Sequence, residues 1–225
     1  MRSDFGSSTL VRLLGEWAPV DAQASGMDFA ERLGLWLNAF DAIGLQAAHQ
    51  SIRAIRSAAP GTPLDARSRR GQTVDEDFQQ VRSTLAHAIA RDLAPLEGAA
   101  QTEKTSYAPY RQRHLELQRQ MEQMITPLRD HVRQALLPVS APLRQLAALD
   151  AVLEQMLATR EQTLLPAVTA LLERRFVQLR DANSEDWLQT FENDWRQALR
   201  AELDLRLEPV AGLIEALSNE LKNRP

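Results

Sequence analysis

Hydrophobic residues recur every three or four positions along most of the chain, which is the spacing that places side chains on one face of an α-helix. The first long stretch with this spacing covers residues 28–55 (DFAERLGLWLNAFDAIGLQAAHQSIRAI). Its first turn and its apolar face contain the four residues that we take as the candidate interaction helix, Asp28, Phe29, Trp36 and Phe40. Aromatic side chains dominate buried cores and interfaces, and they are only 5% of this chain, so this helix is predicted to organise an N-terminal core.

The helical pattern is interrupted after this stretch. Residues 58–73 (AAPGTPLDARSRRGQT) replace periodic apolar positions with Pro, Gly, Ser and charged residues. Such a composition predicts a flexible linker, which would separate an N-terminal helical segment, residues 1–57, from a helical bundle, residues 74–225. A Thr-x-x-Glu capping box at Thr73 is predicted to begin the next helix.

From Tyr110 to the C-terminus the chain is almost entirely helical in pattern. One apolar stripe ends at Leu137-Pro138, and Ser140 is placed to cap a new helix with Pro142 in its first turn. The polar residues 181–184 (DANS) predict a second turn.

Three further prolines fall inside otherwise continuous helical patterns and are predicted to kink or break them. They are Pro127, Pro166 and Pro209. β-branched residues are few and do not alternate with polar ones, so no strand is predicted. The pattern therefore predicts an all-α fold of about six amphipathic helices, whose C-terminal part is an elongated bundle or an antiparallel coiled-coil hairpin.

The composition of the chain excludes several classes of function. The chain has 225 residues, 44% hydrophobic and 25% charged, which is typical of a globular protein. It has no cysteine, which excludes disulfides, thiolate metal sites and a cysteine nucleophile and fits a reducing compartment. A net charge of −4 argues against a general nucleic-acid binder. With no signal peptide and no long uncharged apolar run, the expected location is the cytoplasm.

Four ionisable residues project into apolar sectors of the predicted helices: Asp41, Asp92, His114 and Arg160. Burying such groups is costly unless they are paired. One hypothesis is that an aspartate meets Arg160, or that an aspartate orients His114 in a cleft suited to acid–base chemistry or metal binding. The alternative is a set of satisfied polar pairs between helices, or residues that water reaches at helix ends.

The predicted linker carries a small basic cluster formed by Arg67, Arg69 and Arg70. It could contact phosphate or an acidic partner, and it could equally be a solvated loop. Elsewhere we find no HExxH pattern, no glycine-rich phosphate loop and no GxSxG motif. The sequence therefore assigns no catalytic residue, no metal ligand and no cofactor.

The N-terminal stretch resembles a family of proteobacterial proteins, the domain of unknown function family 3348. The matching phrases are Asp28–Gly34, Trp36-Leu37, Asp41–Ile43 and Leu45–Ala48, and the resemblance is clearest over residues 7–57. The family has no established activity. Its members are often encoded near envelope proteins of flagellar-stator and peptidoglycan-binding type, so the resemblance implies a bacterial accessory of a membrane-embedded assembly.

These observations favour a non-enzymatic helical adaptor or assembly factor that binds itself or a protein partner through the aromatic helix or the long C-terminal helices. Two alternatives stay open. One is a regulatory protein that associates with nucleic acid through the arginine cluster, and the other is a metal- or acid–base-dependent enzyme built on Asp41, Asp92 and His114.

Overall fold

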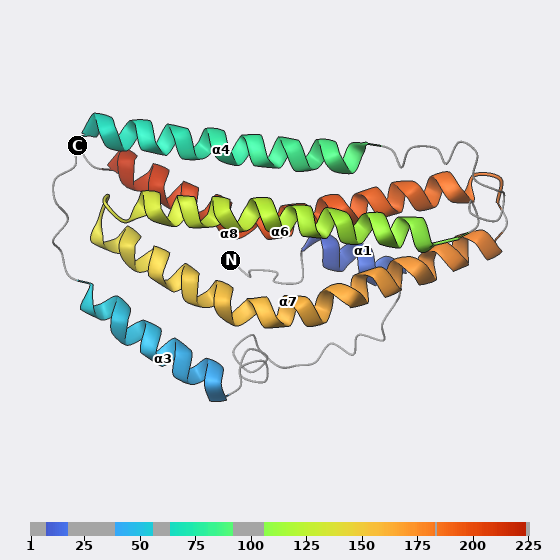
Figure 1. The fold of residues 1–225 in the computed structure, drawn as a ribbon, viewed down its shortest axis with the longest axis horizontal. Helices are drawn as coiled ribbons and strands as arrows, with labels where there is room; N and C mark the ends of the chain where they lie inside the picture. Colours follow the sequence, from blue (N-terminus) through green and yellow to red (C-terminus); the bar gives the residue numbers. More distant parts are fainter. Residues whose placement is uncertain (1–7, 18–38, 56–63, 92–105, 183, 224–225) are drawn as a thin grey trace. The chain divides into compact units, whose positions relative to one another are not determined.

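The computed structural model describes residues 8–17, 39–55, 64–91, 106–182 and 184–223, with the backbone alone described for residues 39–41, 64–70, 159–166 and 223. This part of the chain contains six α-helices and no strand (Figure 1). The helices are α1 (Thr9–Trp17), α3 (Ala39–Ala54), α4 (Leu64–Ala90), α6 (Ala108–Leu136), α7 (Ala141–Asp181) and α8 (Trp187–Asn223). The predicted all-α fold is confirmed.

The break between α6 and α7 lies where the capping residues predict it. α6 ends at Leu136, and α7 begins at Ala141. The hydroxyl of Ser140 accepts a hydrogen bond from the backbone N–H of Leu143 at 3.3 Å, which satisfies one of the free donors of the first turn. The chain reverses its direction at this turn, so α6 and α7 run antiparallel on either side of it (Figure 1).

The three prolines do not break their helices. Pro127 lies inside α6, Pro209 lies inside α8, and α7 continues through position 166. The side chains of Pro127 and Pro209 are exposed, so each ring and its missing N–H face solvent. A lost helical hydrogen bond is tolerated best on the side where water can satisfy the freed carbonyl.

The predicted linker is wrong from Leu64 onward, because α4 begins there and residues 64–73 are its first turns. This stretch contains several residues with good helix propensity, Leu, Ala and Arg among them. It also joins the apolar stripe that starts at Val74, which is fully buried. Tertiary packing of that stripe extends the helix through a segment whose composition resembles a loop. Residues 58–63 lie outside the described residues.

The chain divides into two compact units, and neither is continuous in sequence. Unit 1 comprises residues 1–20, 79–127 and 163–208, and unit 2 comprises residues 21–78, 128–162 and 209–225. The division into an N-terminal segment and a C-terminal bundle stays a prediction.

The core of unit 1 is an aromatic cluster. It brings together half of the chain's aromatic residues, namely Tyr107, Tyr110, Phe176, Trp187, Phe191 and Trp195. The ring centroids of Phe176 and Phe191 are 4.9 Å apart at 87°, and those of Tyr110 and Phe191 are 5.0 Å apart at 89°. These edge-to-face contacts fasten the start of α6 to the end of α7 and the start of α8.

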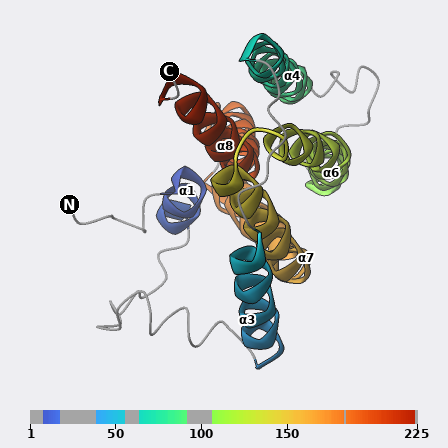
Figure 2. The same ribbon diagram turned by 90° about the vertical axis from the view of Figure 1, so that its left-hand side faces the viewer.

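The core of unit 2 is aliphatic, with Val132, Leu136 and Val210 among its fully buried residues. Figures 1 and 2 show α3 beside the first part of α7. There the side-chain amide of Gln145 donates hydrogen bonds to the carbonyls of Ile52 at 3.1 Å and Ile55 at 3.4 Å. These carbonyls lie in the last turn of α3 and just after it, where the regular helical acceptor pattern ends, and the Ile52 carbonyl also accepts from the N–H of Ile55 at 3.2 Å.

The helix predicted over residues 28–55 is confirmed at its C-terminal end, because α3 ends at Ala54. Its predicted burial is wrong at Ile43, whose side chain is 64% exposed, whereas Ala48 is buried. Helical periodicity shows which residues share a face, but the face is covered only where another helix lies against it. The predicted first part of this helix lies outside the described residues.

Candidate functional site

A buried polar network joins α6 to α8 inside unit 1. His114 is 0% exposed, and the side chain of Glu202 is 2% exposed, with His114 Nε2 lying 3.3 Å from Glu202 Oε2. Gln118, one turn after His114, donates from its amide to Glu202 Oε1 at 3.0 Å and to Oε2 at 3.1 Å. Arg206, one turn after Glu202, donates to Oε1 from Nε at 3.0 Å and from Nη2 at 2.9 Å.

Glu202 is held as a carboxylate. Burial opposes its charge and by itself would raise its pKa, but the contact with His114 and the charge of Arg206 outweigh burial and lower the pKa of Glu202 below its ordinary value of 4.5. Neither ring nitrogen of His114 makes a hydrogen bond of good geometry within the described part of the chain. The imidazole is thus held within ion-pair distance of Glu202 without being aligned to it.

This network suits a structural role better than catalysis. Glu202 Oε1 accepts three hydrogen bonds, and both carboxylate oxygens are screened from water. A general base must reach a substrate proton directly or through one water, and neither His114 nor Glu202 faces solvent. Among the described residues, no cluster of three or more His, Asp or Glu side chains could hold a metal ion.

Of the four ionisable residues singled out in the sequence, His114 belongs to this network. His114 does lie among buried side chains, and the carboxylate beside it is Glu202, which the pattern analysis did not single out. A signal for Glu202 was present, because it lies three residues after Leu199 and seven after Trp195, on the buried face of α8. The side chains of Asp41, Asp92 and Arg160 lie outside the described residues, so their pairing stays a prediction.

Unit 2 has a second charged network across the α6–α7 hairpin. Arg129 makes a bidentate pair with Asp150, from Nε at 2.8 Å and from Nη2 at 2.6 Å. Arg133 bonds Asp150 at 3.0 Å and Glu154 at 2.6 Å, and it also pairs with Asp130. Burial by itself would lower the pKa of Arg133, but these carboxylates raise it, so the guanidinium stays charged.

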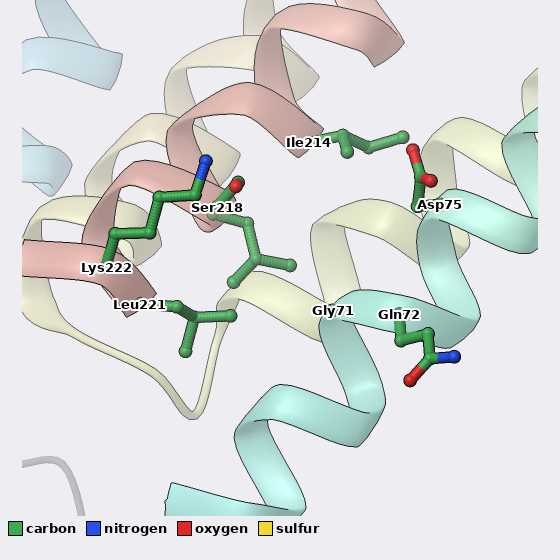
Figure 3. A pocket seen from close by; sticks show the side chains of 8 residues that line it. Gly71, Gln72, Asp75, Ile214, Ser218, Leu221 and Lys222 are labelled. Carbon is green, nitrogen blue, oxygen red and sulfur yellow. The ribbon is translucent and has the colours of Figure 1, made fainter.

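A groove of about 490 Å³ lies between α4 and α8 in unit 2. Its lining residues are Gly71, Gln72, Asp75, Ile214, Leu217, Ser218, Leu221 and Lys222. Figure 3 shows the Lys222 ammonium on the side of Ser218, and the Asp75 carboxylate at the other end beside Ile214. A Cβ on Gly71 would lie 3.0 Å from Leu221 Cδ1, so the missing side chain lets α4 and α8 approach closely.

Unit 2 also leaves an apolar surface open on α7. Leu149, Leu153 and Leu157 are 37%, 38% and 45% exposed, and we call these three residues the α7 leucine stripe. They lie four residues apart, so their side chains follow one another along one face. Helical spacing alone would favour burial of such leucines, but the structure leaves them at the surface because no described helix lies over that face.

The other candidate interaction residues stay predictions. Asp28, Phe29 and Trp36 lie outside the described residues, and only the backbone is described at Phe40. Arg67, Arg69 and Arg70 belong to α4, with their side chains outside the described residues.

Comparison with known proteins identifies the family. A family described as "Protein of unknown function (DUF3348)" matches residues 1–219. The chain belongs to this family. The resemblance noted in the N-terminal stretch thus extends over nearly the whole DUF3348 protein. No curated protein and no solved structure gives a significant match. Among the described helices of this family member, none has the length and apolar character needed to cross a membrane.

Proposed function

We propose that this DUF3348 protein is a non-enzymatic helical adaptor or assembly factor that acts in the cytoplasm and binds protein through the α7 leucine stripe. The observation that supports the proposal most directly is the exposure of Leu149, Leu153 and Leu157 along one face of one helix. Contiguous exposed apolar surface is typical of protein-binding sites.

The stripe differs from the other exposed apolar residues. In unit 1 the exposed large apolar residues among those described are Val11, Leu115, Val177 and Leu205, and they lie singly on four different helices. Single exposed apolar residues are normal on a protein surface. Covering the exposed part of each leucine in the stripe would contribute about 1 kcal/mol, since burying a whole leucine side chain contributes about 1.5–3 kcal/mol.

Two further observations favour an adaptor over an enzyme. The buried carboxylates of the described residues, Glu202 and Asp150, are committed to arginine and amide donors. The groove between α4 and α8 is lined by neither of them. The cysteine-free sequence fits the reducing cytoplasm. Members of the family that the N-terminal stretch resembles are often encoded near envelope proteins, which favours a partner in an envelope-associated complex.

The test is affinity capture from the native cell in mild detergent, read by mass spectrometry. The baits are the full chain, the double variant Leu153→Glu/Leu157→Glu, and the matched control Leu115→Glu/Leu205→Glu, which places the same two charges on exposed leucines of unit 1. Far-ultraviolet circular dichroism checks that each bait is folded.

We expect proteins captured by the full chain and by the control to be missing from the double variant. An unchanged set of captured proteins in all three baits would contradict the proposal. A fourth bait, Phe29→Ala/Trp36→Ala, tests whether the predicted aromatic interaction helix contributes separately.

A further inference from the structure

We infer that α3 is a releasable strap, which covers part of a broad apolar face of α7 and must be displaced before a partner can occupy the whole of that face. This inference rests on the proposed function, because it states how access to the leucine stripe is controlled. It is carried by the apolar residues of α7 beside the stripe, by the place where α3 is attached and by how little of α3 is buried.

The apolar face of α7 is wider than the leucine stripe. Each leucine of the stripe follows another apolar residue, and these preceding residues are Ala148, Val152 and Met156. They lie four residues apart, as the leucines do, so they form a second row along the helix beside the first. All three are half-buried, whereas the leucines of the stripe are exposed. The two rows together form one apolar face that is broad enough to pack against another helix.

The attachment of α3 is on the side of α7 that carries the second row. The side-chain amide of Gln145 donates to the carbonyls of Ile52 at 3.1 Å and Ile55 at 3.4 Å. Gln145 precedes Ala148 by three residues and Val152 by seven, so it lies on the same face of α7 as that row. From this attachment α3 runs beside the first part of α7 (Figures 1 and 2). α3 is therefore the helix placed to cover the second row, and it leaves the leucine stripe open.

Few side chains hold α3 in place. Among its described side chains Ala48 alone is buried, whereas those of α4 include the buried residues Val74, Phe78, Leu85 and Ile89. The side chain of Ala48 is a single methyl group, so docking it removes little apolar surface from water. A helix with few buried apolar contacts opens locally at a lower free energy than the core does. α3 can therefore be displaced while the α6–α7 hairpin stays folded.

Because the chain has no cysteine, one introduced thiol can report whether the second row is covered. Val152→Cys places the thiol in that row, and its rate of reaction with N-ethylmaleimide measures how often α3 is displaced. The displacing variant is Ala48→Glu, which puts a charge at the buried position of α3. Ala47→Glu is the matched control, since it adds the same charge to the same helix at an exposed position. Circular dichroism checks that each variant is folded.

We expect Ala48→Glu to raise the labelling rate of Val152→Cys by about ten-fold or more, because an unpaired charge opposes docking of α3. Ala47→Glu should leave that rate unchanged. In the natural chain, amide hydrogens of α3 should exchange at least about a hundred-fold faster than those of α6, through local opening. In affinity capture, Ala48→Glu should raise the yield of the proteins that Leu153→Glu/Leu157→Glu fails to capture.

Three outcomes would overturn the inference. They are one labelling rate of Val152→Cys in all three backgrounds, α3 amides that exchange only when the whole chain unfolds, and a yield of captured proteins that Ala48→Glu leaves unchanged or lowers. Each of them leaves the proposed function standing if Leu153→Glu/Leu157→Glu still loses partners. If that double variant loses none while Ala48→Glu speeds labelling, the proposed function is wrong and the release of α3 is confirmed.

Discussion

Both units bury charge between packed helices, but they do so in different settings. In unit 1 the side chain of Glu202 is 2% exposed and meets one arginine, Arg206, beside His114 and Gln118. In unit 2 the side chains of Asp150 and Glu154 are 10% and 27% exposed, and each meets two arginines. Unit 2 also leaves leucines at its surface. The difference indicates that unit 1 buries its carboxylate in a closed core, whereas unit 2 combines redundant ion pairs with exposed leucines on α7.

The largest effect is expected at Phe176, whose ring contacts those of Tyr107, Tyr110, Trp187 and Phe191. Phe176→Ala should lower the free energy of unfolding by about 3–5 kcal/mol, because it removes apolar contacts and leaves a cavity in a closed core. Urea denaturation measures this loss. The control is Val177→Ala at the exposed neighbouring position, which should change stability by less than about 1 kcal/mol. A similar loss in both variants would contradict a closed aromatic core.

The two charged networks should differ in how much stability is lost when one carboxylate is removed. Glu202→Ala should cost about 3–5 kcal/mol, because among the described residues Arg206 has no other carboxylate and would be left with an uncompensated charge. Asp150→Ala should cost about 1–3 kcal/mol, because Arg133 keeps Glu154. Urea denaturation of both variants under the same conditions gives the two values. Equal losses of stability in the two variants would show that Glu154 does not compensate for the missing Asp150 carboxylate.

Sequence reasoning predicted those features of the fold that depend on local chemistry. Ser140 caps α7 because a hydroxyl before a helix satisfies free N–H groups whatever the rest of the chain does. The burial of His114 follows from its place in the stripe of α6. Both predictions use residues close together in sequence, where the physical cause is local.

The features that were missed depend on residues distant in sequence. Glu202 can be buried because Gln118 on α6 donates hydrogen bonds to its carboxylate and His114 of the same helix lies beside it. No local pattern in the sequence specifies that pairing. Gly71 suggested a linker, although its missing side chain instead lets α4 lie close to Leu221. Ile43 occupies a helical stripe that no described helix covers.

The two tyrosines allow unit 1 to be observed by itself. The chain has only Tyr107 and Tyr110, and burial raises the pKa of each above the ordinary value of 10. Their hydroxyls donate to the carbonyl of Thr169 and to Glu192, both at 2.9 Å. A pKa raised on folding stabilises the protein fully below pH 10, and this contribution is lost as pH rises through the folded value.

We therefore expect phenolate absorbance to appear only as the protein unfolds at high pH, at the same point as the loss of helical circular dichroism. Unfolded protein in concentrated urea, which should titrate near pH 10, serves as the control. Phenolate formation near pH 10 with full helix content would contradict the closed core of unit 1.

The lowered pKa of Glu202 predicts an effect of the opposite sign in acid. A carboxyl group whose pKa is depressed on folding contributes stability above its unfolded value of 4.5, and that contribution is lost as pH falls through the lower folded value. Glu202→Gln cannot gain or lose this proton. The difference in free energy of unfolding between the natural chain and Glu202→Gln should therefore be greatest at neutral pH and shrink below pH 4.5. A difference that does not vary with pH would place its cause in packing and not in charge.

The smallest effect is expected at the helix cap of unit 2. Ser140→Ala should lower the free energy of unfolding by about 1 kcal/mol, because the N–H of Leu143 loses its acceptor in a buried turn. Ser140→Asp is the matched control, since a carboxylate can accept the same hydrogen bond and is favoured at a helix N-terminus. Thermal unfolding followed by circular dichroism should place the alanine variant below the natural chain and the aspartate variant above the alanine variant. If the cap only joins α6 to α7 and does not shape the leucine stripe, the set of proteins captured from the cell should be unchanged in both variants. A loss of captured proteins in Ser140→Ala would instead show that the position of α7, and with it the leucine stripe, depends on this turn.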